Sequence, residues 1–154
     1  MKSRTLSATA LIPLTPLVVL AFQAEAEQVR KGELKDKSFT AGPLKITFLS
    51  FGRARGFGNV GDPHVESVNP IKVKVENASD EFTTFNPRRL SFVDKANDQS
   101  DVRGLVTSQR GLSAAEDRRI APKASITDWY DLTREVRLPA RLYYEDKLLA
   151  TIIE

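Results

Sequence analysis

The stretch Ile71-Lys72-Val73-Lys74-Val75-Glu76 alternates apolar and charged residues more strictly than any other part of the chain. Successive side chains of a β-strand point to opposite faces, so the three apolar residues share one face and the three charged residues share the other. A strand of this kind buries its apolar face in the core and exposes its charged face to solvent, as in many antiparallel sheets. The turn-forming residues Asn77-Ala78-Ser79-Asp80 follow at once and end the strand.

Further segments with strand character lie on both sides of this one. They span residues 44–51, 89–94, 102–107, 124–132, 141–144 and 148–153, with a hairpin turn at Glu145-Asp146-Lys147. In 124–132, Tyr130 has the phase of the apolar residues, whereas Trp129 has the opposite phase. About seven short strands in roughly 110 residues predict an all-β fold, an immunoglobulin-like antiparallel β-sandwich.

Helix signals are scarce. Ser113-Ala114-Ala115-Glu116 matches a capping box, and Gly111 and Pro122 limit the helix expected there to one or two turns. Parallel α/β architecture needs crossover helices of about ten or more residues between strands. The sequence contains no such helical segments, so this class is excluded.

Residues 1–26 have the features of a secretory signal peptide. Lys2 and Arg4 precede a stretch without charge, and Ala24-Glu25-Ala26 supplies the small-x-small cleavage pattern. A retained membrane anchor is the alternative, but two prolines interrupt the stretch, and a span needs about 20 apolar residues. We expect cleavage after Ala26, export to the periplasm or the extracellular space, and no stable membrane insertion afterwards. Residues 27–43 then form a polar lead-in or a short first strand, and 44–154 form the sandwich.

The composition excludes several kinds of site. Cysteine is absent from the 154 residues, which excludes disulfides, thiolate metal sites and cysteine nucleophiles. The 23 basic and 20 acidic residues are interleaved, and the resulting net charge of +3 does not predict a nucleic-acid footprint. We therefore expect no cofactor, no metal site and no nucleic-acid partner.

Six short segments of the mature chain carry a resemblance to a known family. They are Val29-x-x-Gly32-Glu33, Leu44-Lys45-Ile46-Thr47, Val73-Lys74-Val75-Glu76-Asn77-Ala78-Ser79, Phe92-Val93-Asp94, Ile120-Ala121-Pro122-Lys123-Ala124, and Leu138-Pro139 before Leu142-Tyr143-Tyr144. The chain thereby resembles the exported immunoglobulin-like (telokin-like) domains of bacterial envelope proteins. Lys123 stands where that family often has glycine. The resemblance implies a binding or scaffolding module and supplies no catalytic residues.

The connection between the strands at 44–51 and 71–76 contains the candidate ligand-binding residues Arg53, Arg55 and Phe57. Long loops on a rigid scaffold often carry binding residues, and arginine beside an exposed aromatic can hold a carboxylate, a phosphate or a ring. A solvated loop without a ligand is the alternative. The same loop contains a literal G-x-G-x-x-G at 56–61, but no helix of useful length follows it. His64, the single histidine, has no Gly-x-Ser-x-Gly motif to accompany it and is interpreted as a surface residue.

Two groups of carboxylates have compositions compatible with chemistry. The densest cluster of potential oxygen ligands consists of Asp94, Asn97, Asp98 and Asp101. Their spacing does not match that of a calcium-binding loop, and polar residues of this kind are also expected in a solvent-exposed loop that binds no metal. Asp128 and Asp131 flank Trp129-Tyr130, which is compatible with a sugar-stacking face beside two acids. Packing in a strand is the preferred explanation of the two aromatic residues.

These observations predict an exported, non-catalytic binding or assembly module of the cell envelope. Its partner is expected to be a protein or an envelope glycan, and the sequence indicates no oligomeric state. One alternative is a periplasmic chaperone or inhibitor that pairs an exposed strand edge with a client. The other is a carboxylate-dependent glycoside hydrolase.

Overall fold

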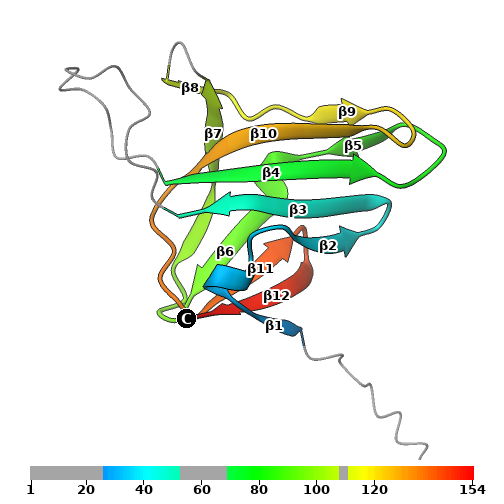
Figure 1. Ribbon diagram of the computed structural model, residues 1–154. Helices are drawn as coiled ribbons and strands as arrows, with labels where there is room; N and C mark the ends of the chain where they lie inside the picture. The colour runs from blue at the N-terminus through cyan, green and yellow to red at the C-terminus, as the bar shows by residue number, and fades with distance from the viewer. Residues whose placement is uncertain (1–25, 53–68, 108–110) are drawn as a thin grey trace, which may run out of the picture.

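The computed structural model describes residues 26–52, 69–107 and 111–154. This part of the chain is all-β, as the sequence predicts (Figure 1). The strands are β1 (Glu27–Arg30), β2 (Lys37–Ala41), β3 (Leu44–Phe51), β4 (Pro70–Asn77), β5 (Thr83–Phe85), β6 (Leu90–Asp94), β7 (Gln99–Thr107), β8 (Gly111–Ser113), β9 (Arg118–Ile120), β10 (Ser125–Leu132), β11 (Ala140–Tyr144) and β12 (Lys147–Ile153). The helical elements of the described residues are two short 3-10 helices, η1 (Lys31–Glu33) and η2 (Pro87–Arg89).

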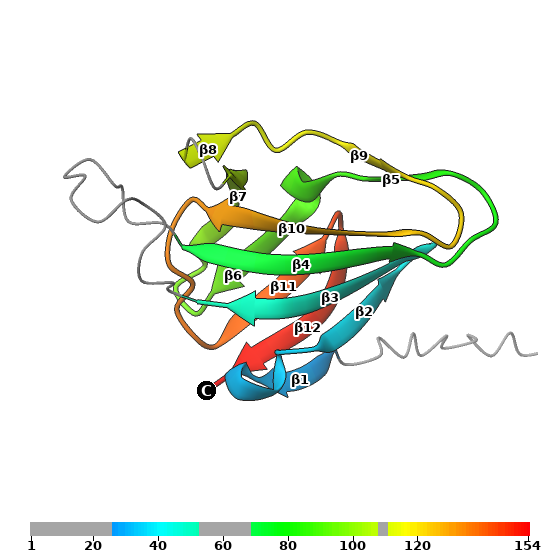
Figure 2. The same ribbon diagram turned by 45° about the horizontal axis from the view of Figure 1, so that its top comes forward.

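A single ten-stranded sheet dominates the fold. Its order is β1-β12-β11-β6-β7-β10-β4-β3-β2, and β8 pairs with β7 beside this path. Strand β7 changes partners along its length, because Gln99 pairs with Val93 of β6 whereas Leu105 pairs with Tyr130 of β10. The sheet curls at β7, so that β10, β4, β3 and β2 form one layer in front of β6, β11 and β12 (Figures 1 and 2).

Aromatic side chains fill the space between the two layers. The ring of Phe92 in β6 lies 6.2 Å from the ring of Phe48 and 5.3 Å from that of Phe51, both in β3. The apolar residues of β4 are buried and its lysines are partly exposed, which confirms the alternation predicted for 71–76. The buried residues form one hydrophobic cluster, and burial of this apolar surface is the main driving force for folding.

The two ends of the curled sheet contact each other through lysine side chains. Lys37 of β2 forms an ion pair with Glu27 of β1. The ammonium group of Lys147 in β12 donates a hydrogen bond of 2.9 Å to the backbone oxygen of Thr40 in β2. Strands that end a sheet expose backbone groups to other chains, and here side chains from the opposite end of the sheet cover part of that edge.

A second, two-stranded sheet of β5 and β9 packs against the main sheet. Its fully buried Phe85 lies between the layers, with ring distances of 6.3 Å to Tyr130 of β10 and 5.6 Å to Tyr144 of β11. The hydroxyl of Tyr144 accepts a hydrogen bond from the backbone nitrogen of Asn86, which follows β5. The small sheet is therefore held by aromatic packing and by a polar contact.

Asn77, at the end of β4, joins two connections of the chain. Its amide nitrogen donates to the backbone oxygens of Glu81, Ile120 and Ala121, and its amide oxygen accepts from the backbone nitrogen and the hydroxyl of Ser79. The side chain is 1% exposed. Asn77-Ala78-Ser79 forms the turn that the sequence predicts, and its asparagine is a buried structural residue.

Three sequence-based expectations need correction. The described residues contain twelve strands rather than about seven, because β1 and β2 lie in the segment before residue 44, and β5, β8 and β9 have three residues each, too few to show a period. Residues 27–43, expected to be a polar lead-in or a short first strand, form the two strands β1 and β2 with η1 between them, and Val29, Leu34 and Phe39 are buried there. The helical turn expected at 113–116 is absent, since Ser113 ends β8 and Ala115 packs into the core.

The signal peptide predicted for residues 1–26 lies, up to residue 25, outside the described residues. Strand β1 begins at Glu27, directly after the predicted cleavage site. In the described part of the chain, no helix combines the length and the hydropathy that a bilayer crossing requires.

Replacing Phe85 with alanine tests the packing of the small sheet. We expect the Phe85→Ala variant to lose about 3–5 kcal/mol of unfolding free energy, because a large buried side chain leaves a cavity between the layers. Phe82 is the matched control, since its ring is 56% exposed and contacts the Arg119 guanidinium at 4.0 Å. The Phe82→Ala variant should lose about 1 kcal/mol or less. Urea unfolding monitored by circular dichroism measures both, and equal losses would contradict the proposed packing role.

Candidate functional site

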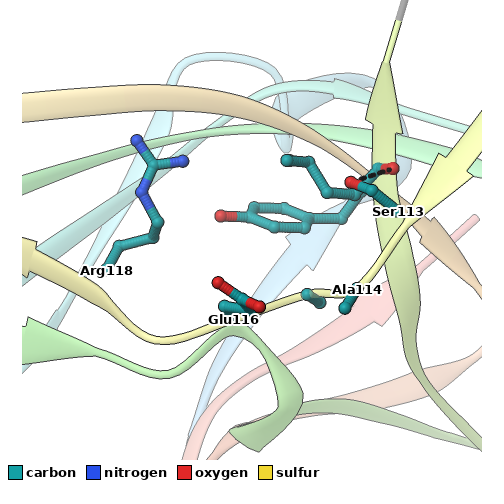
Figure 3. Close-up of a pocket in the computed structure, with 7 residues that line it drawn as sticks. Ser113, Ala114, Glu116 and Arg118 are labelled. Carbon is teal, nitrogen blue, oxygen red and sulfur yellow. Dashed lines mark hydrogen bonds between the residues drawn. The ribbon is translucent and has the colours of Figure 1, made fainter.

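A cleft of about 260 Å³ lies under the connection between β8 and β9. Its lining combines small apolar side chains with hydroxyl and charged groups: Leu105, Ser113, Ala114, Ala115, Glu116, Arg118 and Tyr130. Figure 3 shows Glu116 and Arg118 extending into one end of this cleft, while Ser113 lies at the other end. Strands β7 and β10 contribute Leu105 and Tyr130, and the β8–β9 region contributes the remaining residues.

The connection that covers the cleft is anchored at both ends. Strand β8 pairs with β7 from Leu105↔Ser113 to Thr107↔Gly111, and β9 pairs with β5. Gly104 permits the close approach of β8, because a Cβ atom at this position would lie 2.8 Å from the backbone oxygen of Ser113. The glycine is needed here for space, and the close strand contact in turn fixes one wall of the cleft.

Tyr130 contributes a hydroxyl group to the cleft. This hydroxyl donates a hydrogen bond of 3.2 Å to the Asp128 carboxylate, which also accepts one of 2.7 Å from Nη1 of Arg118. Burial, and next the Asp128 charge, raise the pKa of Tyr130 well above its usual range. The Tyr130 side chain therefore stays protonated and neutral. Its hydroxyl proton points to Asp128, and its oxygen can still accept a hydrogen bond from another group.

Glu116 and Arg118 both line the cleft without pairing with each other. In the described part of the chain, the Glu116 carboxylate has no ionic or hydrogen-bonding partner, and Arg118 pairs with Asp128 through Nη1. Both groups lie on the rim, where Glu116 is exposed and the side chain of Arg118 is 38% exposed. The cleft thus presents an open carboxylate and remaining guanidinium N–H donors at the same end.

The structure separates the two aspartates considered for glycoside hydrolysis. Three positions apart in β10, Asp128 and Asp131 project from opposite faces of the strand. Asp131 is fully buried, where it accepts hydrogen bonds from Nε of Arg103 at 2.8 Å and from the backbone nitrogen of Asn69 at 2.6 Å. Each carboxylate is therefore paired with its own arginine, and the two do not face a common substrate position.

The acidic cluster of the β6–β7 turn is built around Asp94. Oδ1 of this buried residue accepts hydrogen bonds from the backbone nitrogens of Ala96 at 2.8 Å and Asp98 at 3.0 Å. Arg134 and Arg137 pair with Asp98, and Arg141 donates to Asn97. Asp101 accepts from the Gln99 amide. Of these residues, Asp94, Asn97 and Arg141 line a second cleft of about 360 Å³, but in the described ranges no three metal-ligating side chains converge.

The candidate residues Arg53, Arg55 and Phe57 lie outside the described residues, as do His64 and the glycines at 56–61. Sequence reasoning did not identify Glu116 or Arg118 as site residues. Their place in the cleft depends on the pairing of β8 with β7 and of β9 with β5, which no local pattern indicates. Tyr130 was predicted to be buried, and its burial is confirmed.

Comparison with known proteins adds little to this geometry. No protein-family model matches the chain, and no curated protein matches it. Among solved structures, the chain is similar to the crystal structure of the yjhA protein from Bacillus subtilis, at a TM-score of 0.48 and 16% sequence identity. The match covers 81% of this chain and 84% of that chain. A likeness of this degree indicates neither a ligand nor an activity for the present chain.

Replacing Gly104 with alanine tests how the cleft wall is held. The added methyl group would contact the Ser113 backbone, so we expect β8 to move away from β7, with a loss of about 1–3 kcal/mol of unfolding free energy. Hydrogen exchange of the β8 amides should accelerate. Gly32→Ala is the matched control, because a Cβ atom at residue 32 meets nothing within 4 Å. Unchanged exchange in β8 would contradict the close-approach argument.

Asp94 provides a pH-dependent test of the β6–β7 turn. Burial acts to raise the pKa of Asp94, but the backbone hydrogen bonds from Asp98 and Ala96 and the nearby Arg137 and Arg134 outweigh it, so the pKa is lowered. Its contribution to stability is therefore complete above the unfolded pKa of about 3.9 and lost as the pH falls through the lower folded value. We expect the wild type to exceed Asp94→Asn in unfolding free energy at pH 7, and this difference to shrink below about pH 4. A difference independent of pH would contradict this assignment.

Proposed function

We propose that this chain is an exported, non-catalytic binding module of the immunoglobulin-like type, which holds a small ligand in the cleft under the β8–β9 connection. The observation that carries the proposal is this cleft of about 260 Å³, in which an open carboxylate, a guanidinium group and a neutral tyrosine hydroxyl meet small apolar side chains. Concave sites with apolar walls and a few polar groups are the usual form of small-molecule sites.

Three further observations support the immunoglobulin-like assignment and the export. The curled sheet has two facing layers with a core between them, as a β-sandwich requires. Lys123, in the position where the telokin-like family often has glycine, adopts φ of +59°, a conformation that glycine favours. Cleavage after Ala26 would leave every strand of the described fold intact, since β1 begins at Glu27.

Strand addition at a sheet edge, as in a chaperone or inhibitor, is less well supported by the geometry. An added strand needs the backbone groups of an end strand. The backbone oxygen of Thr40 in β2 already accepts from Lys147, and Lys37 of the same strand pairs with Glu27 of β1. The cleft requires no such displacement to bind a ligand.

The proposed cleft binding can be tested with two tryptophan variants of neighbouring residues. Ala114 is an exposed residue of the cleft wall, and Leu112 is exposed on the same segment without lining the cleft. The probe is a hydrolysate of bacterial cell envelope that contains amino acids, amino sugars and oligosaccharides, with binding detected by ligand-observed NMR. We expect Ala114→Trp to weaken binding at least about tenfold, since the indole fills the cleft, whereas Leu112→Trp should bind like the wild type.

Other results would contradict this assignment. Equal binding by the two variants would remove the cleft from consideration. Loss of binding only in an Arg53→Ala, Arg55→Ala, Phe57→Ala triple variant would assign the ligand to the 53–68 connection instead. Absence of any binding would count against a module for small ligands. Expression of the full chain in an exporting host tests localisation, and the secreted form should begin at Glu27.

A further inference from the structure

The polar groups of the cleft have a consequence for the kind of ligand that fits it. The carboxylate of Glu116 lines the cleft and has no ionic or hydrogen-bonding partner among the described residues. A ligand without an N–H or O–H donor would remove water from the carboxylate and provide no compensation, and a neutral donor would replace the hydrogen bonds but leave the charge unpaired. A protonated amine, with up to three N–H donors, supplies both the charge and the hydrogen bonds.

Arg118 imposes the opposite requirement at the same end of the cleft (Figure 3). Its hydrogen bond to Asp128 uses Nη1, and a guanidinium group carries five N–H donors in a fixed plane. The remaining donors of Arg118 are suited to a second carboxylate, which a ligand can supply. Asp128 holds the guanidinium in place, so the donors are already oriented before a ligand arrives.

The Tyr130 hydroxyl limits the ligand further. Because its proton is directed to the Asp128 carboxylate, the phenolic oxygen serves the cleft as a hydrogen-bond acceptor. An ammonium group near Glu116 can donate to it. The carboxylate of a ligand finds its donors on Arg118 rather than on the tyrosine.

The volume and the walls of the cleft limit the rest of the ligand. About 260 Å³ is below the range of roughly 300–1,000 Å³ for drug-sized ligands. Leu105, Ala114 and Ala115 provide an apolar wall without further charge. This wall suits a short aliphatic group, and it offers no partner for a second charged group.

We propose that the cleft binds a free α-amino acid with a short aliphatic side chain, its ammonium group on Glu116 and Tyr130 and its carboxylate on Arg118. This inference rests on the proposed function of the cleft as a binding site. It names the ligand class as a small zwitterion, in which the two charged groups are attached to the same carbon atom. A peptide terminus does not meet this requirement, because it offers one of the two charges and an amide in place of the other.

Titration of the full chain with a matched set of leucine derivatives tests the ligand class. L-Leucine should bind at least about tenfold more tightly than leucinamide, which lacks the carboxylate, and than N-acetylleucine, which lacks the ammonium group. Isothermal calorimetry or ligand-observed NMR measures the affinities. L-Lysine should bind more weakly than leucine, because its second ammonium group would contact the apolar wall.

Two variants assign the contact of the ammonium group. Glu116→Gln should weaken leucine binding at least about tenfold and leave the weak binding of N-acetylleucine unchanged, since that compound has no ammonium group to lose a partner. Asp117→Asn is the matched control, because Asp117 is an exposed acid in the same connection that does not line the cleft. It should bind leucine like the wild type. Thermal unfolding of both variants distinguishes loss of the contact from loss of the fold.

The possible outcomes separate the zwitterion proposal from the proposed function. Leucinamide binding as tightly as leucine would overturn the Arg118 contact and define a site for amines. Equal effects of Glu116→Gln and Asp117→Asn would overturn the Glu116 contact. If no amino acid binds while the envelope hydrolysate still loses binding in Ala114→Trp, the ligand class is wrong and the cleft remains a binding site. If neither binds, both proposals are wrong.

Discussion

The double pairing of β7 is the constraint on which the rest of the structure depends. The first part of this strand belongs to the layer of β6, and its later part belongs to the layer of β10. Because one strand serves two layers, the sheet must curl, and the curl brings Phe92 against Phe48 and Phe51. The same strand carries Gly104, which admits β8 and so creates a wall of the cleft. The core and the candidate site therefore share one structural origin.

Buried polar side chains join connections that are distant in the sequence. Asn77 ties the turn after β4 to the turn before β10, and Asp131 of β10 holds both Asn69 and Arg103. In the described part of the chain, every buried side-chain nitrogen or oxygen has a partner. An unpaired polar group in the interior is costly, so these partners fix where each connection lies. Connections that are fixed in this way can form a cleft with a lasting shape.

The sequence predicts the parts of this fold that repeat with a period of two. Seven segments show that period or its hydrophobic content, and each has a strand at that position, because a half-buried strand leaves its alternation in the sequence. Tyr130 and Trp129 were also assigned to opposite faces, and Tyr130 is buried whereas Trp129 is half-buried. The strands β5, β8 and β9 have three residues each, which is too short for an alternating pattern to be visible in the sequence. They are strands because they pair with other segments of the chain, and the local sequence does not indicate this pairing. Glu116 and Arg118 lie on this part of the chain, and for this reason the cleft could not be predicted, while Asp128 could be noted only as an acid beside two aromatic residues.

Strand β1, at the start of the fold, pairs in parallel with β12, at its end. A polypeptide that leaves a ribosome or a translocation channel with its N-terminus first presents β1 long before β12 is available. Val29 of β1 can reach its final place beside Ile152 only when the residues up to Ile152 have emerged. The β1–β12 pair can therefore form only after every strand between them has been delivered, so the fold is completed by a contact between the first and the last of its strands.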